Sequence, residues 1–196
     1  MDEIVLRGML KWPNVPSVYG WLRLDRRGQW LIKTVGGRFE RIGNAAVSEF
    51  IGRNYASDAD GRWYFQNGPQ RVYVTLDYTP WVYRLDDIAG ALVAHTGAAP
   101  RAIECVFLDE AGALLLHTEL GIGVLLDRDL AAVLERVADP RGGDIESLIE
   151  KISQGGEARV VLQGNVVTIA SIRAADVAGR FGFNPRPGPR PGEPEC

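Results

Sequence analysis

The sequence predicts an α+β fold of antiparallel hairpins and short helices, arranged as two small, similar subdomains. Three observations favour this class. At three places an Asp-x-x-Gly turn leads directly into an apolar strand. Segments that alternate apolar and polar residues are short, as β-strands are. Segments with the apolar spacing of a helix are also short, and capping residues precede them.

The repeated turn has one spacing throughout: an aspartate, two variable residues, a glycine, and a large residue two positions later. Its copies are Asp25-x-x-Gly28-x-Trp30, Asp58-x-x-Gly61-x-Trp63 and Asp109-x-x-Gly112-x-Leu114. The aspartate accepts hydrogen bonds from the amides that follow, and the glycine takes the positive φ that lets the strand return. We therefore expect three serial hairpins. The aspartates are scaffold rather than metal ligands, because no loop has the ligand density or closing glutamate of a calcium site.

Most of the first half is expected to form strands. Pro13 and Pro16 predict an irregular arm over residues 1–17. Asn44 is a suitable N-cap for a helix over residues 45–55, whose apolar residues share one face. The predicted strands are residues 19–24, 29–33, 62–65, 70–76 and 81–85.

The second half alternates between strands and helices. Strands are predicted at residues 103–108 and 113–117, a helix is predicted to end near Val137, and another spans residues 145–154. A hairpin over residues 158–170 and a short helix over residues 174–178 follow.

These elements divide the chain into three parts. Residues 1–86 form an aromatic-rich sheet-plus-helix subdomain, and residues 87–183 form a second subdomain of sheet and helices. Residues 184–196 are rich in proline and glycine and have no apolar periodicity, which predicts a disordered tail.

Composition excludes several classes of partner. No stretch of about 18 apolar residues is present, so no transmembrane helix and no membrane partner are expected. Residues 1–100 carry a net charge of +2 and residues 101–196 one of −5, without a basic cluster, which argues against nucleic acid. The acidic start is not a secretory signal, and Cys105 and Cys196 form no disulfide framework. We expect a cytoplasmic protein.

The sequence contains no motif for catalysis or for a cofactor. His95 and His117 do not have the spacing of metal ligands, and no phosphate-binding glycine loop or nucleophile elbow is present. We therefore expect no catalytic residues, no metal and no cofactor. A hydrolase that uses His117 with Glu119 is a less favoured alternative.

Aromatic residues concentrate in the first half, where 14 of 17 precede residue 84. On the strand at residues 70–76, alternation predicts that Arg71 and Tyr73 face outward while Val72 and Val74 face the core. An arginine among aromatic rings, with amides nearby, suits a carboxylate, a phosphate or a peptide. The candidate ligand-binding residues are Asn67, Gln70, Arg71, Tyr73, Tyr78, Trp81 and Tyr83.

Two interpretations of these residues remain open. They line an exposed ligand site, or they form a seam at which Arg71 pairs with an acid of the second half. A groove between the subdomains would fit both interpretations.

Residues 18–85 also carry a resemblance. A Gly-x-Trp/Tyr strand, a proline-containing loop before a valine-rich strand, and the segment Tyr78-Thr79-Pro80-Trp81-Val82 resemble uncharacterised proteobacterial families of domains of unknown function. The resemblance implies two domains of repeated sheet-plus-helix motifs and a signalling role, with no assigned reaction and no catalytic residues. The chain departs from these families near Gly36-Gly37 and in its proline-rich tail.

The expected function is that of a non-enzymatic binding or regulatory protein. It would hold a small anion or a peptide in a groove between the subdomains. The alternative is a homodimer, or another interaction or structural protein, with the aromatic face as its interface.

Overall fold

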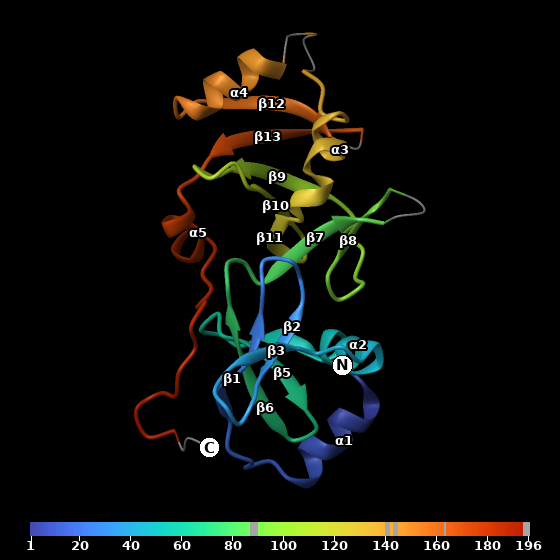
Figure 1. Ribbon diagram of the computed structural model, residues 1–196, viewed down its shortest axis with the longest axis vertical. Helices are drawn as coiled ribbons and strands as arrows, with labels where there is room; N and C mark the ends of the chain where they lie inside the picture. Colours follow the sequence, from blue (N-terminus) through green and yellow to red (C-terminus); the bar gives the residue numbers. More distant parts are fainter. Residues whose placement is uncertain (87–89, 140–141, 143–144, 163, 194–196) are drawn as a thin grey trace. The chain divides into compact units, whose positions relative to one another are not determined.

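The computed structural model describes residues 1–86, 90–139, 142, 145–162 and 164–193 of the chain. Contacts divide the chain into two compact units. Unit 1 comprises Met1–Pro80, His95–Gly97 and Gly182–Cys196, and unit 2 comprises Trp81–Ala94 and Ala98–Phe181 (Figure 1). Among the described residues, no helix is both long enough and apolar enough to cross a membrane.

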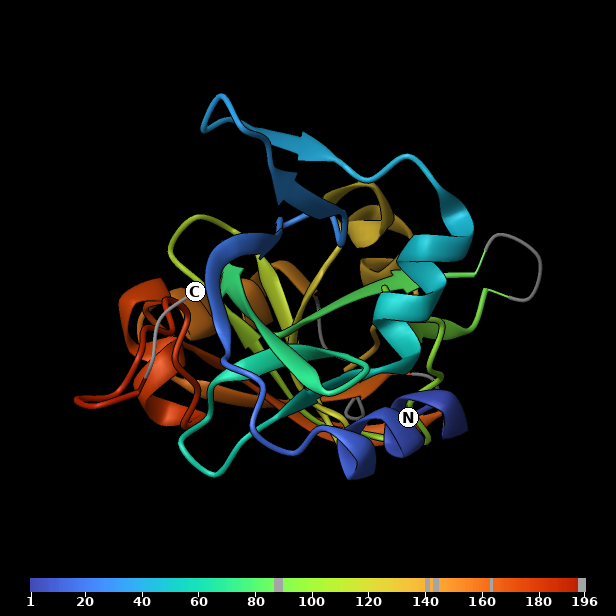
Figure 2. The same ribbon diagram turned by 90° about the horizontal axis from the view of Figure 1, so that it is seen from below.

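Unit 1 contains a six-stranded mixed sheet with the order β3-β2-β1-β6-β5-β4. Neighbouring strands are antiparallel except β1 and β6, which are parallel. The strands are β1 (Val18–Leu24), β2 (Trp30–Lys33), β3 (Phe39–Arg41), β4 (Tyr55–Ser57), β5 (Trp63–Asn67) and β6 (Gln70–Leu76). Its two helices, α1 (Glu3–Lys11) in dark blue and α2 (Ala45–Arg53) in cyan, are seen from below in Figure 2.

Unit 2 contains a seven-stranded mixed sheet with the order β12-β13-β9-β10-β11-β7-β8. The pairs β7 with β11 and β9 with β13 are parallel. The strands are β7 (Trp81–Leu85), β8 (Leu92–Ala94), β9 (Ile103–Leu108), β10 (Leu114–Thr118), β11 (Gly121–Leu125), β12 (Glu157–Leu162) and β13 (Asn165–Ser171). The helices are the 3₁₀ helix η1 (Asp127–Asp129), α3 (Leu130–Leu134), α4 (Ile145–Ser153) and α5 (Ala174–Arg180).

The two units share a topology. Each has an antiparallel three-stranded meander, then helix, then further antiparallel strands. In each, the last of these strands pairs in parallel with the first strand of the meander: β6 with β1, and β13 with β9. The prediction of an α+β fold with two similar subdomains is confirmed.

The three Asp-x-x-Gly turns have the predicted geometry. In each turn the aspartate Oδ1 accepts hydrogen bonds from the amides two and four residues later, at 2.7–3.0 Å. The glycines have φ of 75°, 70° and 81°. The turns join β1 to β2, β4 to β5 and β9 to β10, so the prediction of serial hairpins is confirmed.

The N-terminal segment differs from the expected irregular arm. Residues Glu3–Lys11 form helix α1, which ends at Trp12, just before Pro13. Two features hold the helix against the rest of unit 1. Val5 is 1% exposed, and Gly8 approaches Gly68 and Pro69 so closely that an added Cβ would lie 3.3 Å from Pro69 Cδ. The prolines end this helix and do not prevent it.

The C-terminal segment (residues 182–193) also differs from the disorder expected of residues 184–196. Asn184 N donates to Gly61 O at 2.9 Å, and Leu76 N donates to Pro185 O at 2.8 Å, so this segment runs along unit 1 (red in Figure 1). Composition predicted disorder because the segment has little apolar surface to bury, but its contacts are polar. Residues 194–196, including Cys196, lie outside the described residues.

The units also divide at a different position from the expected boundary at residues 86 and 87. The division falls between Pro80 and Trp81, and His95–Gly97 return to unit 1. Residues 87–89 at the expected boundary lie outside the described residues.

Candidate functional site

A buried arginine is the centre of the polar cluster in unit 1. Arg62 directly follows the second Asp-x-x-Gly turn, and it is 5% exposed. Its Nε donates to Asp58 Oδ2 at 2.8 Å, and its Nη2 donates to the Tyr73 hydroxyl at 3.1 Å. The Tyr73 hydroxyl in turn donates to the same Asp58 oxygen at 3.1 Å. Asp58 therefore has two roles: one carboxylate oxygen closes the turn, and the other holds the arginine.

The Arg62 guanidinium lies against a stack of aromatic rings. Tyr73 and Tyr19 stack with ring centroids 4.6 Å apart and planes 3° apart. The Arg62 guanidinium lies over the Tyr73 ring at 4.6 Å. Tyr64 meets Tyr73 edge to face at 5.8 Å, and Arg71 lies over Tyr64 at 4.6 Å. Because strands β1, β5 and β6 adjoin in the sheet, these residues form one ordered stack.

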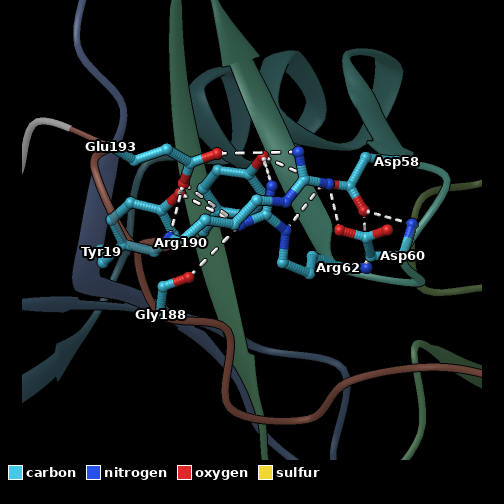
Figure 3. Close-up of polar contacts among 8 residues, drawn as sticks. Tyr19, Asp58, Asp60, Arg62, Gly188, Arg190 and Glu193 are labelled. Atoms are coloured by element: carbon cyan, nitrogen blue, oxygen red, sulfur yellow. Dashed lines mark hydrogen bonds and ion pairs between the residues drawn. The ribbon is translucent and has the colours of Figure 1, made fainter.

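The C-terminal segment approaches the remaining nitrogen of Arg62, its Nη1 (Figure 3). Nη1 donates to Gly188 O and to Glu193 Oε2, each at 3.3 Å, and to the Tyr19 hydroxyl at 3.4 Å. The Tyr19 hydroxyl donates to Glu193 Oε2 at 2.7 Å. A carboxylate that lies 131 residues after Arg62 in the sequence is thus bound by this arginine, next to the second turn, and by a tyrosine of β1.

The charges of the cluster stabilise one another. Hydrogen bonds from the Arg190 amide, Tyr19 and Arg62 lower the pKa of Glu193 to about 2. Burial acts to raise the pKa of Asp58, but hydrogen bonds from Arg62 and Tyr73 lower it overall. Burial acts to lower the pKa of Arg62, yet its bonds to Glu193 and Asp58 raise it overall.

The tyrosine pKa values shift in the opposite sense from those of the acids. Burial is the main cause that raises the pKa of Tyr19 and of Tyr73. At neutral pH the arginine is charged, the carboxylates are ionised and the tyrosines are neutral.

The structure brings some of the predicted site residues into this cluster. Tyr73 is a member, but it is 2% exposed rather than facing outward, because Tyr19 covers that face of β6. Arg71 lies one ring away, over Tyr64. Asn67 and Gln70 face each other at the end of the β5–β6 hairpin, where Gln70 Nε2 donates to Pro16 O at 3.2 Å.

The other predicted residues lie elsewhere. Arg26 lies over the ring of Tyr78 at 4.4 Å. Trp81 and Tyr83 are buried in unit 2. There the Tyr83 hydroxyl lies 2.7 Å from Thr118 Oγ1 and donates to Gly121 O at 3.0 Å. A groove between the subdomains remains a prediction.

The two side chains of the hydrolase alternative have separate partners in unit 2. His117 Nδ1 lies 3.0 Å from Glu104 Oε2, while Glu119 accepts from the amides of Arg101 and Ala102. A cleft of about 850 Å³ in this unit is lined by residues of the third turn and α5, and neither His117 nor Glu119 lines it. In the part of the chain that the structure describes, no group of His, Cys, Asp or Glu could hold a metal ion.

A half-buried histidine also lies in unit 1. His95 packs against Trp30 at 5.2 Å and Tyr55 at 5.7 Å between ring centroids, and burial lowers its pKa to about 3. It is a neutral core residue at physiological pH.

Sequence reasoning did not identify Arg62, Glu193 or Arg190 as site residues. One signal could have found Arg62: it occupies the position after the turn glycine, where the other two copies have Gln29 and Ala113. Arg62 is charged where the other two copies are neutral, and it lies two residues after a second aspartate, Asp60. These two differences distinguish the second turn from the other copies.

Comparison with known proteins gives one family and one related fold. The family model DUF2944, described as a protein of unknown function (DUF2946), matches residues 1–188. A crystal structure of a DUF1285 family protein from Silicibacter pomeroyi DSS-3 is similar, with a TM-score of 0.53 and 17% sequence identity. The match covers 81% of this chain and 85% of that chain, and it shows the fold alone. Among curated proteins, no match was found.

Proposed function

Because the chain belongs to the DUF2944 family, whose function is unknown, we propose a function from the site itself: unit 1 is a non-enzymatic binding module for a carboxylate on a segment of a protein. The observation that carries this proposal is the Glu193 carboxylate, which Arg62 and Tyr19 bind at 3.3 and 2.7 Å.

The scaffold orients Arg62 for this role. Asp58 and Tyr73 use its Nε and Nη2, so the guanidinium cannot rotate, and Nη1 points toward Tyr19 and the C-terminal segment. A donor that is already fixed loses little conformational freedom when it binds a ligand. The site is therefore preorganised for an acceptor at Nη1.

The surrounding charges favour a carboxylate over a phosphate. Asp58 and Asp60 lie in the turn next to Arg62, and they already carry two negative charges. A singly charged carboxylate meets less repulsion from these aspartates than a phosphate with nearly two negative charges would.

The protonation states favour binding over catalysis at this site. A general acid or base works best with a pKa near the working pH. The shifts in this cluster move the acids down and the tyrosines up, away from neutrality.

Calorimetric titration of the full chain tests the proposal. The probe is a peptide with the sequence of residues 186–193 and blocked ends, so that Glu193 supplies its only carboxylate. We expect it to bind the Glu193→Ala chain, in which Arg62 and Tyr19 have lost the chain's own carboxylate. It should bind a Glu40→Ala control only weakly, because Glu40 is an exposed residue of β3 and Glu193 keeps its place on the site.

Adding Tyr19→Phe to the Glu193→Ala chain removes one donor to the carboxylate but keeps the ring. This change should weaken binding of the peptide about tenfold. Absence of binding to the Glu193→Ala chain, or equal binding with and without the Tyr19 hydroxyl, would contradict the proposal.

A further inference from the structure

The glutamate bound by Arg62 is the last residue of a β-turn. Glu193 N donates to Arg190 O at 2.9 Å, which closes the turn Arg190-Pro191-Gly192-Glu193. Gly192 has φ of 87°. Proline at the second position and glycine with positive φ at the third are the signature of a type II turn. The sequence of the segment therefore preforms the shape in which the glutamate is presented.

The two charged residues of this turn each pair with a residue of opposite charge at the second Asp-x-x-Gly turn. Its first residue, Arg190, forms an ion pair with Asp60, and its fourth, Glu193, forms one with Arg62. Arg190 N also donates to Glu193 Oε2 at 2.9 Å, so the turn orients its own carboxylate. Asp60 and Arg62 flank Gly61 of the second Asp-x-x-Gly turn, so one turn binds another.

The residues before the turn make one backbone contact with the site. Gly188 O accepts from Arg62 Nη1 at 3.3 Å, so the same nitrogen binds a peptide carbonyl and the glutamate. Pro189 and Pro191 have no N–H, so this stretch leaves few backbone donors that need a partner. Proline also restricts the free segment, which lowers the entropy lost on binding.

Resting on the carboxylate site proposed above, we infer that the partner of unit 1 is a protein segment that folds into an Arg-Pro-Gly-Glu turn. The arginine of this segment binds Asp60 and its glutamate binds Arg62 and Tyr19. The chain's own residues 190–193 are the copy of this motif that occupies the site in the absence of the partner.

This arrangement makes the site self-regulated. A tethered segment competes at an effective concentration on the order of millimolar. A partner must therefore bind more strongly than the tethered segment does, or bind a chain whose tail has been released from the site. The wild-type chain should bind a free turn peptide at least about tenfold more weakly than a chain that lacks Arg190 and Glu193 side chains.

A double-mutant cycle tests the inference. The full chain carries Arg190→Ala and Glu193→Ala, with or without Asp60→Asn, and is titrated with the blocked peptide of residues 186–193. A second peptide has alanine in place of the arginine that corresponds to Arg190, and a third has Ala-Ala in place of the last Pro-Gly. The cycle isolates the contact between the peptide arginine and Asp60.

We expect the peptide without the arginine to bind two- to fivefold more weakly, about the size of an exposed ion pair, and this loss to vanish on the Asp60→Asn chain. The Ala-Ala peptide should also bind more weakly, because it does not preform the turn. Equal binding of all three peptides would overturn the turn motif but leave the carboxylate site intact. Absence of binding by every peptide would overturn the carboxylate site itself.

Discussion

Replacement of Gly61 by alanine should detach the C-terminal segment from unit 1. An alanine Cβ at this position would lie 2.0 Å from Gly182 O and 2.8 Å from Phe183 Cα, both backbone atoms. Real Cβ atoms essentially never approach other atoms within 3.0 Å, so the segment must retreat by about 1 Å. The hydrogen bond from Asn184 N to Gly61 O, at 2.9 Å, is the first contact that this movement strains.

The loss of stability in Gly61→Ala can be compared with that in a matched control, Gly37→Ala. Gly37 has φ of 79°, close to the 70° of Gly61, but no atom lies within 4 Å of its added Cβ. Both alanine variants carry the left-handed strain of about 1–2 kcal/mol. Gly61→Ala also loses a backbone hydrogen bond, about 1 kcal/mol, and repacks the segment. It should therefore lower the free energy of unfolding of unit 1 by at least about 1 kcal/mol more than Gly37→Ala.

Chemical denaturation followed by tryptophan fluorescence measures this difference, because four of the five tryptophans lie in unit 1. The same Gly61→Ala chain should bind the peptide of residues 186–193 more tightly than wild type, since its own tail is displaced. Equal stability of the two alanine variants, together with unchanged peptide binding, would refute the placement of the segment.

Three further perturbations test the structure. Arg62→Ala leaves Asp58 without its buried partner and should cost about 3 kcal/mol of unfolding free energy in chemical denaturation, whereas a loss below about 1 kcal/mol would show that the pair is not buried. His95 has its pKa lowered to about 3 in the folded state, so protonation favours the unfolded state below its ordinary pKa of 6.5. Stability should fall by about 2 kcal/mol between pH 7 and pH 5 and fall less in His95→Gln; identical pH profiles would contradict the burial of His95. Gly123→Ala places a Cβ 2.4 Å from the Tyr83 ring and should destabilise unit 2 by about 2 kcal/mol in denaturation followed by circular dichroism, and an unchanged midpoint would argue against this contact.

The hairpins could be predicted because their causes are local. Asp25, Asp58 and Asp109 close their turns through amides two and four residues away, and no distant contact is needed. Helix α2 was predicted for the same reason, since Asn44 caps it by accepting from Val47 N. Helix α1 could not be predicted, because its stability comes from the burial of Val5 and the contact of Gly8 with Pro69.

The site was predicted only in part, because its contacts are long-range. The aromatic residues pointed to Tyr73 and Arg71, which do lie in or beside the stack. Alternation placed Tyr73 outward, but it could not show that Tyr19 from β1 covers that face. Glu193 was not predicted because it lies in a tail of polar composition. Composition predicts order from the apolar surface that a segment can bury, and it takes no account of ion pairs.

The ionisation of Glu193 is the most direct test of the carboxylate site. Carbon-detected NMR titration of the Glu193 carboxyl in the labelled full chain should give a midpoint of about 2, against an ordinary value of 4.5. Because the pKa of Glu193 is lowered in the folded state, its contact with Arg62 and Tyr19 stabilises the folded chain above pH 4.5, and this stabilisation is lost as the pH falls toward 2. Tyr19→Phe should move the midpoint up toward 4.5. A wild-type midpoint near 4.5, or one that Tyr19→Phe leaves unchanged, would contradict the binding of this carboxylate by Arg62 and Tyr19.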